Sequence, residues 1–185
     1  MIRIVGGLYR GRKINVPKGK NVKATSDKVR GAIFNILSSV LNWEELMALD
    51  LFAGSGSLGL EALSRGAKKV IFVELVSKNI LTIKNNIELI SPEQDRIELI
   101  QNKALPWVTH LFNSELKCVA FLDPPFTSNE YNPILEKISI LSVVKKGSFI
   151  VVQSHKNRKI LIPKNLEILK HRLYGSVMLH ILQKC

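Results

Sequence analysis

A carboxylate, two prolines and an aromatic ring follow an apolar run in the stretch FLDPPFTS, residues 121–128. Neither proline can donate a backbone hydrogen bond, so the corner Asp123-Pro124-Pro125-Phe126 fits neither a central strand nor a helix. The Asp123 carboxylate and the Pro124 carbonyl, whose direction the prolines stiffen, are acceptors that could hold the N–H of an exocyclic amine on a base. Phe126 offers a face on which that base could stack. An ordinary tight turn is the alternative, and it is the better account of the corner taken alone.

A second motif with chemical meaning is the glycine-rich turn Gly54-x-Gly56-x-x-Gly59 in DLFAGSGSLG. It lies between an apolar run and an expected helix, and Glu74 ends the next apolar run, 20 residues after Gly54. Glycines at this spacing allow a tight turn and close approach of a ligand, while an acid at this distance suits ribose hydroxyls. The pattern predicts a nucleotide-type ligand at the carboxyl ends of parallel strands.

Asp50, just before this turn, helps to distinguish between possible nucleotide-type ligands. A carboxylate is an awkward neighbour for a diphosphate, but it suits the ammonium and sulfonium groups of S-adenosylmethionine. Alternatively, Asp50 holds the glycine loop through backbone N–H groups, and the two roles can coexist. Together with Glu74 and the Asp123 corner, this turn favours an in-line methyl transfer that depends chiefly on positioning.

The elements that would position these residues alternate between short apolar strands and helices. That rhythm is typical of βαβ units, a parallel sheet and right-handed crossovers. Near the end of the chain, Tyr174-Gly175-Ser176 between two alternating segments predicts an antiparallel hairpin at the sheet edge. We expect strands at 47–52, 69–74, 96–101, 117–123 and 148–153, with helices from the glycine turn to about 65, at 77–90, at 104–112 and at 130–141.

The N-terminal segment differs from the rest. Two β-prone stretches, 2–5 and 13–16, are joined by GGLYRGR, which indicates a basic hairpin or an extended arm. Thr25-Ser26-Asp27 supplies N-cap chemistry for a following helix. Spacings of three and four predict that this helix buries one face, made of Val29, Ile33, Ile36, Leu37, Val40 and Leu41.

The positive charge lies at the two ends of the 185-residue chain, whose net charge is +12. Residues 1–30 hold nine Lys or Arg and one Asp, and residues 151–185 hold seven and one Glu. Residues 31–150 hold eleven basic and thirteen acidic residues. Clustered charge of this kind is the electrostatic footprint of a binder of phosphate backbones, and a solvated basic face is the alternative.

Composition excludes several other classes. The chain is long enough for one main domain with a substantial core. The sequence has neither an apolar run of about 18 residues, as a membrane span needs, nor a signal-peptide pattern at its start. Its two cysteines fit neither a disulfide framework nor a zinc site. We therefore expect a cytoplasmic protein with reduced thiols and no metal.

The motifs DLFAGSGSLGLEALSRGA, FVE and FLDPPF together resemble the class I S-adenosylmethionine-dependent methyltransferases that modify exocyclic amines. At the start of the chain, RIVGGLYRGRKINVP and KATSDKVRGAIFNIL look like the RsmD family, which methylates the N2 amine of one guanine in 16S rRNA. The resemblance implies an α/β, Rossmann-like fold with a mostly parallel seven-stranded sheet flanked by helices. It further implies a basic arm at 1–24, a methyltransferase domain at 25–185 with a leading helix at 25–45, and a 16S rRNA substrate within a small-subunit particle. Monomer is the default.

The resemblance also implies roles for particular residues. Thr25, Ser26 and Arg30 would close over the cofactor or the target base, although helix capping accounts equally well for the first two. Asp123, Pro124, Pro125 and Phe126 would hold the target guanine amine. The cofactor residues would be Asp50, Phe52, Ala53, Gly54, Ser55 and Gly56 at the methionine part, Glu74 at the ribose, Asn102, Lys103 and Ala104 at the adenine, and also Leu75. The RNA-binding residues would be Arg3, Arg10, Arg12, Lys13, Lys18, Lys20, Lys23 and Arg30.

Four positions depart from the family pattern: Ala24, Gly31, Val76 and Lys103. Val76 stands where an acid or amide is usual, and Lys103 stands where Asp or Asn is frequent. Asn102 or a backbone N–H must then contact the adenine. None of the four belongs to the Asp123 corner.

Three other functions stay open from the sequence. The corner does not distinguish guanine N2 from adenine N6 of DNA or of another RNA, although a DNA enzyme would usually carry a larger insertion for target recognition. An NAD-dependent oxidoreductase is disfavoured by Asp50 and by the lack of an evident His or Tyr for hydride transfer beside the pocket. A nucleic-acid-binding module with a decayed site is disfavoured by the intact Asp50, Glu74 and Asp123 motifs.

Overall fold

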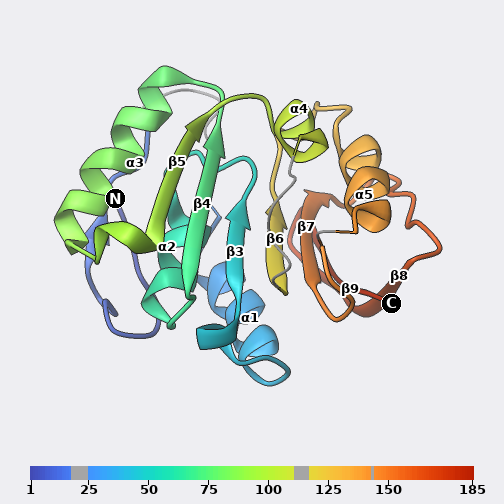
Figure 1. Ribbon diagram of the computed structural model, residues 1–185, viewed down its shortest axis with the longest axis horizontal. Helices are drawn as coiled ribbons and strands as arrows, with labels where there is room; N and C mark the ends of the chain where they lie inside the picture. The colour runs from blue at the N-terminus through green and yellow to red at the C-terminus, as the bar shows by residue number, and fades with distance from the viewer. Residues whose placement is uncertain (18–24, 111–116, 143) are drawn as a thin grey trace.

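The sheet at the centre of the molecule has the order β5-β4-β3-β6-β7-β9-β8 (Figure 1). The computed structural model describes residues 1–17, 25–110, 117–142 and 144–185, and the seven strands of this sheet lie within them. The first five strands in this order run parallel, while β9 is antiparallel to both β7 and β8. The strands are β3 (Met47–Asp50), β4 (Lys69–Glu74), β5 (Ile97–Gln101), β6 (Cys118–Leu122), β7 (Phe149–His155), β8 (Leu166–Tyr174) and β9 (Val177–Lys184).

The fold class expected from the sequence is confirmed, and most element bounds agree closely. The hairpin at Gly175 joins β8 to β9 as predicted. The helices are α1 (Asp27–Ser38), α2 (Ser57–Ser64), α3 (Ser77–Ile90), α4 (Ala104–Thr109) and α5 (Tyr131–Ile140), with short 3-10 turns at Trp43–Glu45 and Gln94–Arg96.

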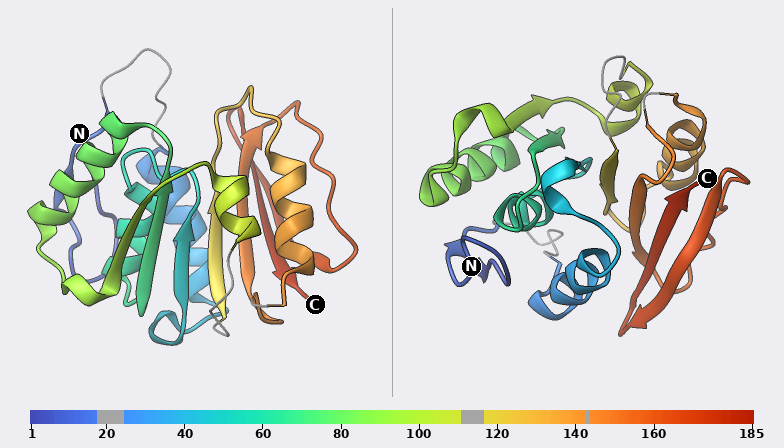
Figure 2. Two further views of the ribbon diagram at one scale, coloured as in Figure 1. Left: turned by 45° about the horizontal axis from the view of Figure 1, so that its top comes forward. Right: turned by 60° about the horizontal axis from the view of Figure 1, so that its bottom comes forward.

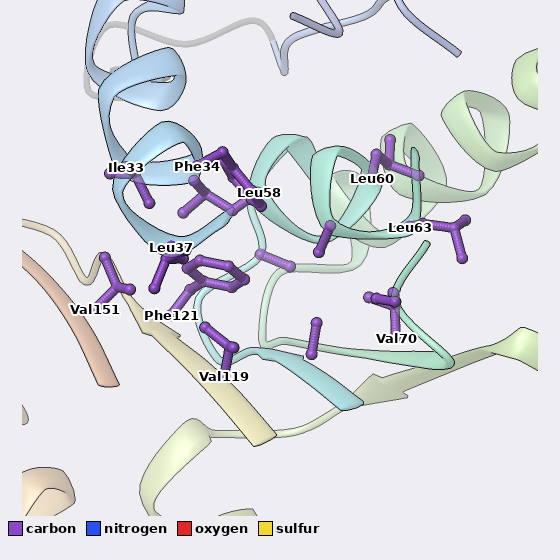
Figure 3. Packing of buried hydrophobic residues seen from close by; sticks show 14 of the residues in the cluster. Ile33, Phe34, Leu37, Leu58, Leu60, Leu63, Val70, Val119, Phe121 and Val151 are labelled. Atoms are coloured by element: carbon purple, nitrogen blue, oxygen red, sulfur yellow. The ribbon is translucent and has the colours of Figure 1, made fainter. Parts of the chain in front are cut away.

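Helices cover both faces of the sheet, so its parallel strands are buried on both sides. Figure 2 shows α1 and α2 on one side and α4 and α5 on the other. Side chains alternate accordingly along β4: Val70 and Phe72 join the core under α1, α2 and α3, whereas Ile71 and Val73 join the core under α4 and α5. Figure 3 shows the first of these cores, where Phe34 of α1 lies near Leu58 of α2.

The N-terminal segment forms a small antiparallel hairpin of β1 (Ile2–Arg3) and β2 (Lys13–Ile14). Its Ile4 and Ile14 side chains are buried in the same core as α1 and α2. Placement of the hairpin against the main body therefore rests on apolar packing as well as on hydrogen bonds.

The sequence prediction for α1 is right about its beginning and wrong about its end. Ser26 is the N-cap and accepts a hydrogen bond from the Val29 N–H at 3.3 Å. The helix ends at Ser38, so Val40, predicted to be buried, lies beyond it and is 54% exposed. Phe34 takes a place in the buried face instead, packed against Phe121 of β6. Within the described residues, none of the helices is long and apolar enough to cross a membrane.

Candidate active site

A cleft of about 1080 Å³ opens at the carboxyl ends of the central strands. Because β3 pairs with both β4 and β6, the acids that end or follow these strands, Asp50, Glu74 and Asp123, meet at one edge of the sheet. This is where open α/β sheets bind ligands. The cleft is lined by all the predicted cofactor and target residues except Gly56: Asp50, Phe52, Ala53, Gly54, Ser55, Glu74, Leu75, Asn102, Lys103, Ala104, Asp123, Pro124, Pro125 and Phe126.

Gly56 and Gly59 in the glycine-rich motif are required for different physical reasons. Gly56 has φ 77° and forms the N-cap of α2, a left-handed conformation that favours glycine. Gly59 lies in the helix, where a Cβ atom would come within 2.2 Å of Cε1 of Phe72 on β4. One glycine therefore permits the turn, and the other permits close packing of α2 on the sheet.

Asp50 is 2% exposed, and its carboxylate accepts a hydrogen bond from the Gly59 N–H at 2.9 Å. Burial raises the pKa of Asp50 to about 7, and the Gly59 bond offsets only part of that effect. The charges of Asp123 and Glu74 raise the pKa further. The geometry thus supports the alternative role weighed from the sequence, a carboxylate that holds the start of α2, while leaving Asp50 in the wall of the cleft.

Glu74 holds the opposite side of the glycine loop. Its two carboxylate oxygens accept from the backbone N–H groups of Gly54 and Val76, each at 2.8 Å. Next to it, the Leu75 and Val76 side chains are 53% and 49% exposed, although both are apolar and line the cleft. Exposed apolar groups beside an oriented carboxylate suit a ligand with a sugar and a flat apolar ring.

The Asp123 corner is held from three sides. The Thr25 hydroxyl donates to Asp123 Oδ2 at 2.9 Å. The phenol of Tyr131 donates to the Pro124 carbonyl at 3.1 Å, and Arg158 Nη2 donates to the Phe126 carbonyl at 2.8 Å. Burial, followed by the charge of Asp123, raises the pKa of the Tyr131 phenol above its ordinary value, so this group remains a donor.

The sequence did not identify three of the residues that support the corner: Tyr131, Arg158 and Gln153, whose Nε2 donates to Thr25 Oγ1 at 3.2 Å. Gln153 carried a usable signal, because it is a polar residue at the end of the apolar run SFIVVQ on a predicted parallel strand. Tyr131 and Arg158 carried none, since a helix start and a basic loop are ordinary places for such residues. His155, at the end of β7, makes an edge contact with the Phe126 ring at 5.7 Å between centroids.

Of the predicted RNA-binding residues, Arg3, Arg10, Arg12 and Lys13 are exposed on or beside the N-terminal hairpin. Lys18, Lys20 and Lys23 lie outside the described residues. The prediction for Arg30 is wrong, because its side chain is fully buried. Arg30 donates to the backbone carbonyls of Arg3 and Thr25 and forms ion pairs with Asp27 and Glu61.

Comparison with known proteins shows the family to which this chain belongs. The family described as "Conserved hypothetical protein 95" matches residues 2–183. Ribosomal RNA small subunit methyltransferase D of Haemophilus influenzae is 35% identical over 98% of this chain and 93% of its own length. The solved structure of yhhF from Escherichia coli has 28% identity and a TM-score of 0.86, covering 99% of this chain and 97% of that chain.

A more distant solved structure, SMU.776 complexed with SAH, has a TM-score of 0.66 over 84% of this chain and 48% of its own. At 12% identity, this similarity supports only a shared fold. The family match over nearly the whole chain and the 35% identical relative decide the assignment. The chain belongs to the RsmD family of ribosomal RNA small subunit methyltransferases, as its motifs predicted.

Proposed function

We propose that this protein transfers a methyl group from S-adenosylmethionine to the exocyclic N2 amine of a guanine in 16S rRNA. Ribosomal RNA methylation follows from the relatives in its family, and family membership decides against the NAD-dependent oxidoreductase. The guanine N2 specificity is the finer part of the proposal. That part rests on the resemblance of the N-terminal motifs to the RsmD family. The observation that carries methyl transfer to an exocyclic amine is the position of the Asp123 corner in the same cleft as the glycine loop and Glu74.

The residues of the cleft fit S-adenosylmethionine. Glu74 would accept from the ribose hydroxyls, and Leu75 and Val76 would cover one face of the adenine. Asn102, Lys103 and Ala104 also line the cleft, and the Asn102 N–H donates to the backbone carbonyl of Glu74 at 3.1 Å. Asp50 would lie beside the methionine part, as would the loop from Phe52 to Gly56. When bound, this cofactor supplies an electrophilic methyl group on a positively charged sulfur.

The protein's own contribution is to hold the amine. An exocyclic amine is a poor nucleophile because its lone pair is delocalised into the ring. The Asp123 carboxylate would accept one amine N–H, and the Pro124 carbonyl, which has a second lone pair besides the one that binds Tyr131, would accept the other. Phe126 would stack on the base. Correct orientation of the two reactants is a large part of catalysis in such a site.

The RNA would reach this site along the basic N-terminal segment. Arg3, Arg10, Arg12 and Lys13 are exposed there and suit phosphate groups, and Lys18, Lys20 and Lys23 complete the proposed set. We propose a small-subunit particle as the substrate, because one short basic segment is too small to select a unique site in naked RNA. The protein would act as a monomer.

The test uses radiolabelled S-adenosylmethionine, the purified protein, and two substrates: small ribosomal subunits lacking base methylation and the naked 16S rRNA extracted from them. We expect labelled N2-methylguanosine in digested RNA from the particle, with much less from naked RNA. Labelled N6-methyladenosine would keep the chemistry and overturn the guanine specificity. No label, with normal cofactor binding, would direct the search to DNA and other RNAs. A protein that binds no cofactor would be a nucleic-acid-binding module with a decayed site.

A further inference from the structure

We infer that Thr25 is a positioning residue for Asp123 and that Gln153 fixes the direction of the Thr25 hydroxyl. The three side chains form a chain of hydrogen bonds. Nε2 of Gln153 donates to Thr25 Oγ1 at 3.2 Å, and Thr25 Oγ1 donates to Asp123 Oδ2 at 2.9 Å. This inference rests on the proposed function, since it concerns the carboxylate that would hold the target amine.

The direction of the two bonds follows from the chemistry of the groups. An ionised carboxylate only accepts, so the single proton of the Thr25 hydroxyl must point to Asp123. The second hydrogen-bond partner of Thr25 Oγ1 must therefore be a donor, and the NH₂ group of Gln153 is that donor. Gln153 is 2% exposed and Thr25 is 9% exposed, so water has little access to exchange with these bonds. The chain thus favours one orientation of the Asp123 carboxylate.

Thr25 is held in place by its backbone, separately from its hydroxyl. The buried Arg30 donates from Nη1 to the Thr25 carbonyl at 3.0 Å. Helix capping does not explain the Thr25 side chain, because Ser26 performs that role. Thr25 therefore directs its hydroxyl into the cleft from a fixed backbone position, and its hydrogen-bond partners lie 98 and 128 residues away along the chain.

Loss of the Thr25 hydroxyl should lower the rate of methyl transfer more than the affinity for the cofactor. Without the Thr25 hydroxyl, the Asp123 carboxylate loses the bond to Oδ2 and the orientation that this bond favours, so the target amine would meet a less well-directed acceptor. Cofactor affinity should be spared, because Thr25 bonds to neither Glu74 nor the glycine loop in the described structure. Misplacement of a reacting group by about 1 Å can lower a rate about a hundredfold.

The experiment compares Thr25→Val, Thr25→Ser and Ile33→Val with the wild-type protein on unmethylated small subunits. Valine keeps the shape of threonine and removes the hydroxyl, and serine restores it. Ile33→Val thins the packing of α1, the helix that follows Thr25, at a buried position outside the lining of the cleft, and it serves as the control for lost stability. Thr25→Val should lower kcat about tenfold to a hundredfold, with the Kd of S-adenosylmethionine and the KM of the subunit within about twofold of wild type. Thr25→Ser should recover most of kcat, and Ile33→Val should lower the Tm alone.

A second pair of variants tests the part played by Gln153. Gln153→Met removes the donor at nearly constant size and should lower kcat by less than Thr25→Val does. The double variant should lose no more than Thr25→Val alone, because Gln153 acts only through Thr25. Wild-type kcat in Thr25→Val, or a loss that serine does not restore, overturns the inference. Additive losses in the double variant overturn the role of Gln153. A wild-type protein that labels no RNA would instead overturn the proposed function.

Discussion

At the scale of single residues, burial of the Asp50 carboxyl group lowers the stability of the folded protein at neutral pH. Its carboxyl group is buried, with the Gly59 N–H as its hydrogen-bond donor, and burial raises its pKa from 3.8 to about 7. Between those two values the folded protein binds a proton that the unfolded chain has released. The free energy of unfolding contributed by this group therefore falls as the pH rises from about 4 to about 7. A buried acid that is kept despite this cost is typical of a functional site.

We predict that Asp50→Asn raises the free energy of unfolding at pH 7 by an amount on the order of a few kcal/mol. Asparagine keeps an oxygen that can accept from the Gly59 N–H, and it carries no charge to desolvate. The measurement is urea unfolding of wild type and variant at pH 4.5 and pH 7, with Asp95→Asn on the surface as the control. The gap between Asp50→Asn and wild type should grow toward pH 7. A gap independent of pH would show that Asp50 does not titrate in this window.

A second prediction at this scale concerns Asp123. We expect Asp123→Ala to abolish methyl transfer, by at least about a hundredfold in kcat, because the amine loses the acceptor that orients it. Cofactor affinity should stay nearly unchanged, since Glu74 and the glycine loop are untouched. Labelled-methyl transfer and equilibrium binding of S-adenosylmethionine measure the two effects, with Asp95→Ala as the control. Wild-type turnover in Asp123→Ala would refute the role assigned to this residue.

At the scale of elements, the close packing of α2 on β4 requires that residue 59 be a glycine, which has no side chain. The helix approaches Phe72 so closely that any Cβ at Gly59 would overlap the ring, and Val70 lies 2.9 Å from the same position. The same helix begins with the turn that faces the cleft, and Asp50 accepts a hydrogen bond from the Gly59 N–H in its first turn. A change in this packing would therefore move the turn at the start of α2, which lines the cleft.

Two glycine-to-alanine changes in helices should have opposite effects. Alanine normally stabilises a helix relative to glycine, and Gly31 on α1 has open space around its Cβ position. Gly31→Ala should thus raise the free energy of unfolding by about 0.4–1 kcal/mol. Gly59→Ala should lower it by about 1–3 kcal/mol, because overpacking outweighs helix propensity. Urea unfolding of both variants provides the comparison, and a stabilised Gly59→Ala would mean that α2 shifts freely.

At the scale of the whole molecule, the basic residues are distributed unevenly along the chain. Residues 31–150 are nearly neutral in net charge and build strands β3, β4, β5 and β6 and most of the cleft, while the basic ends of the chain supply the N-terminal hairpin and strands β8 and β9. At the N-terminal end, the β1–β2 hairpin packs Ile4 and Ile14 into the main core. The division into an arm at 1–24 and a domain at 25–185 stays a prediction, since its boundary adjoins residues outside the described ranges.

We predict that binding to small subunits or to 16S rRNA weakens steeply with salt, because phosphate contacts release counterions. Arg10→Ala should lower the slope of log affinity against log salt by about one, uniformly across RNA sequences. The control is Lys146→Ala, which removes an exposed charge before β7, at the sheet edge opposite the cleft. Affinity that does not change with salt, or equal effects of the two variants, would contradict the proposal that the N-terminal basic residues contact RNA phosphates.

The sequence by itself determined the order of strands and helices, the glycine turn and the three acids that end or follow β3, β4 and β6. These features are local: a period of two or of 3.6 residues reports which side of an element is buried, and glycine or proline marks where it turns. In parallel strands, the carboxyl ends also meet at one edge without further information. Family motifs then added the reaction class.

Only the tertiary structure decided the partners of individual side chains. Arg30 was predicted to bind RNA, yet packing of α1 against α2 and the hairpin buries it beside Glu61. The same packing brings Thr25 to Asp123 and Gln153, across 98 and 128 residues of sequence. Periodicity cannot report such pairs, because a hydrogen bond between distant side chains depends on the distance and angle that the folded core imposes.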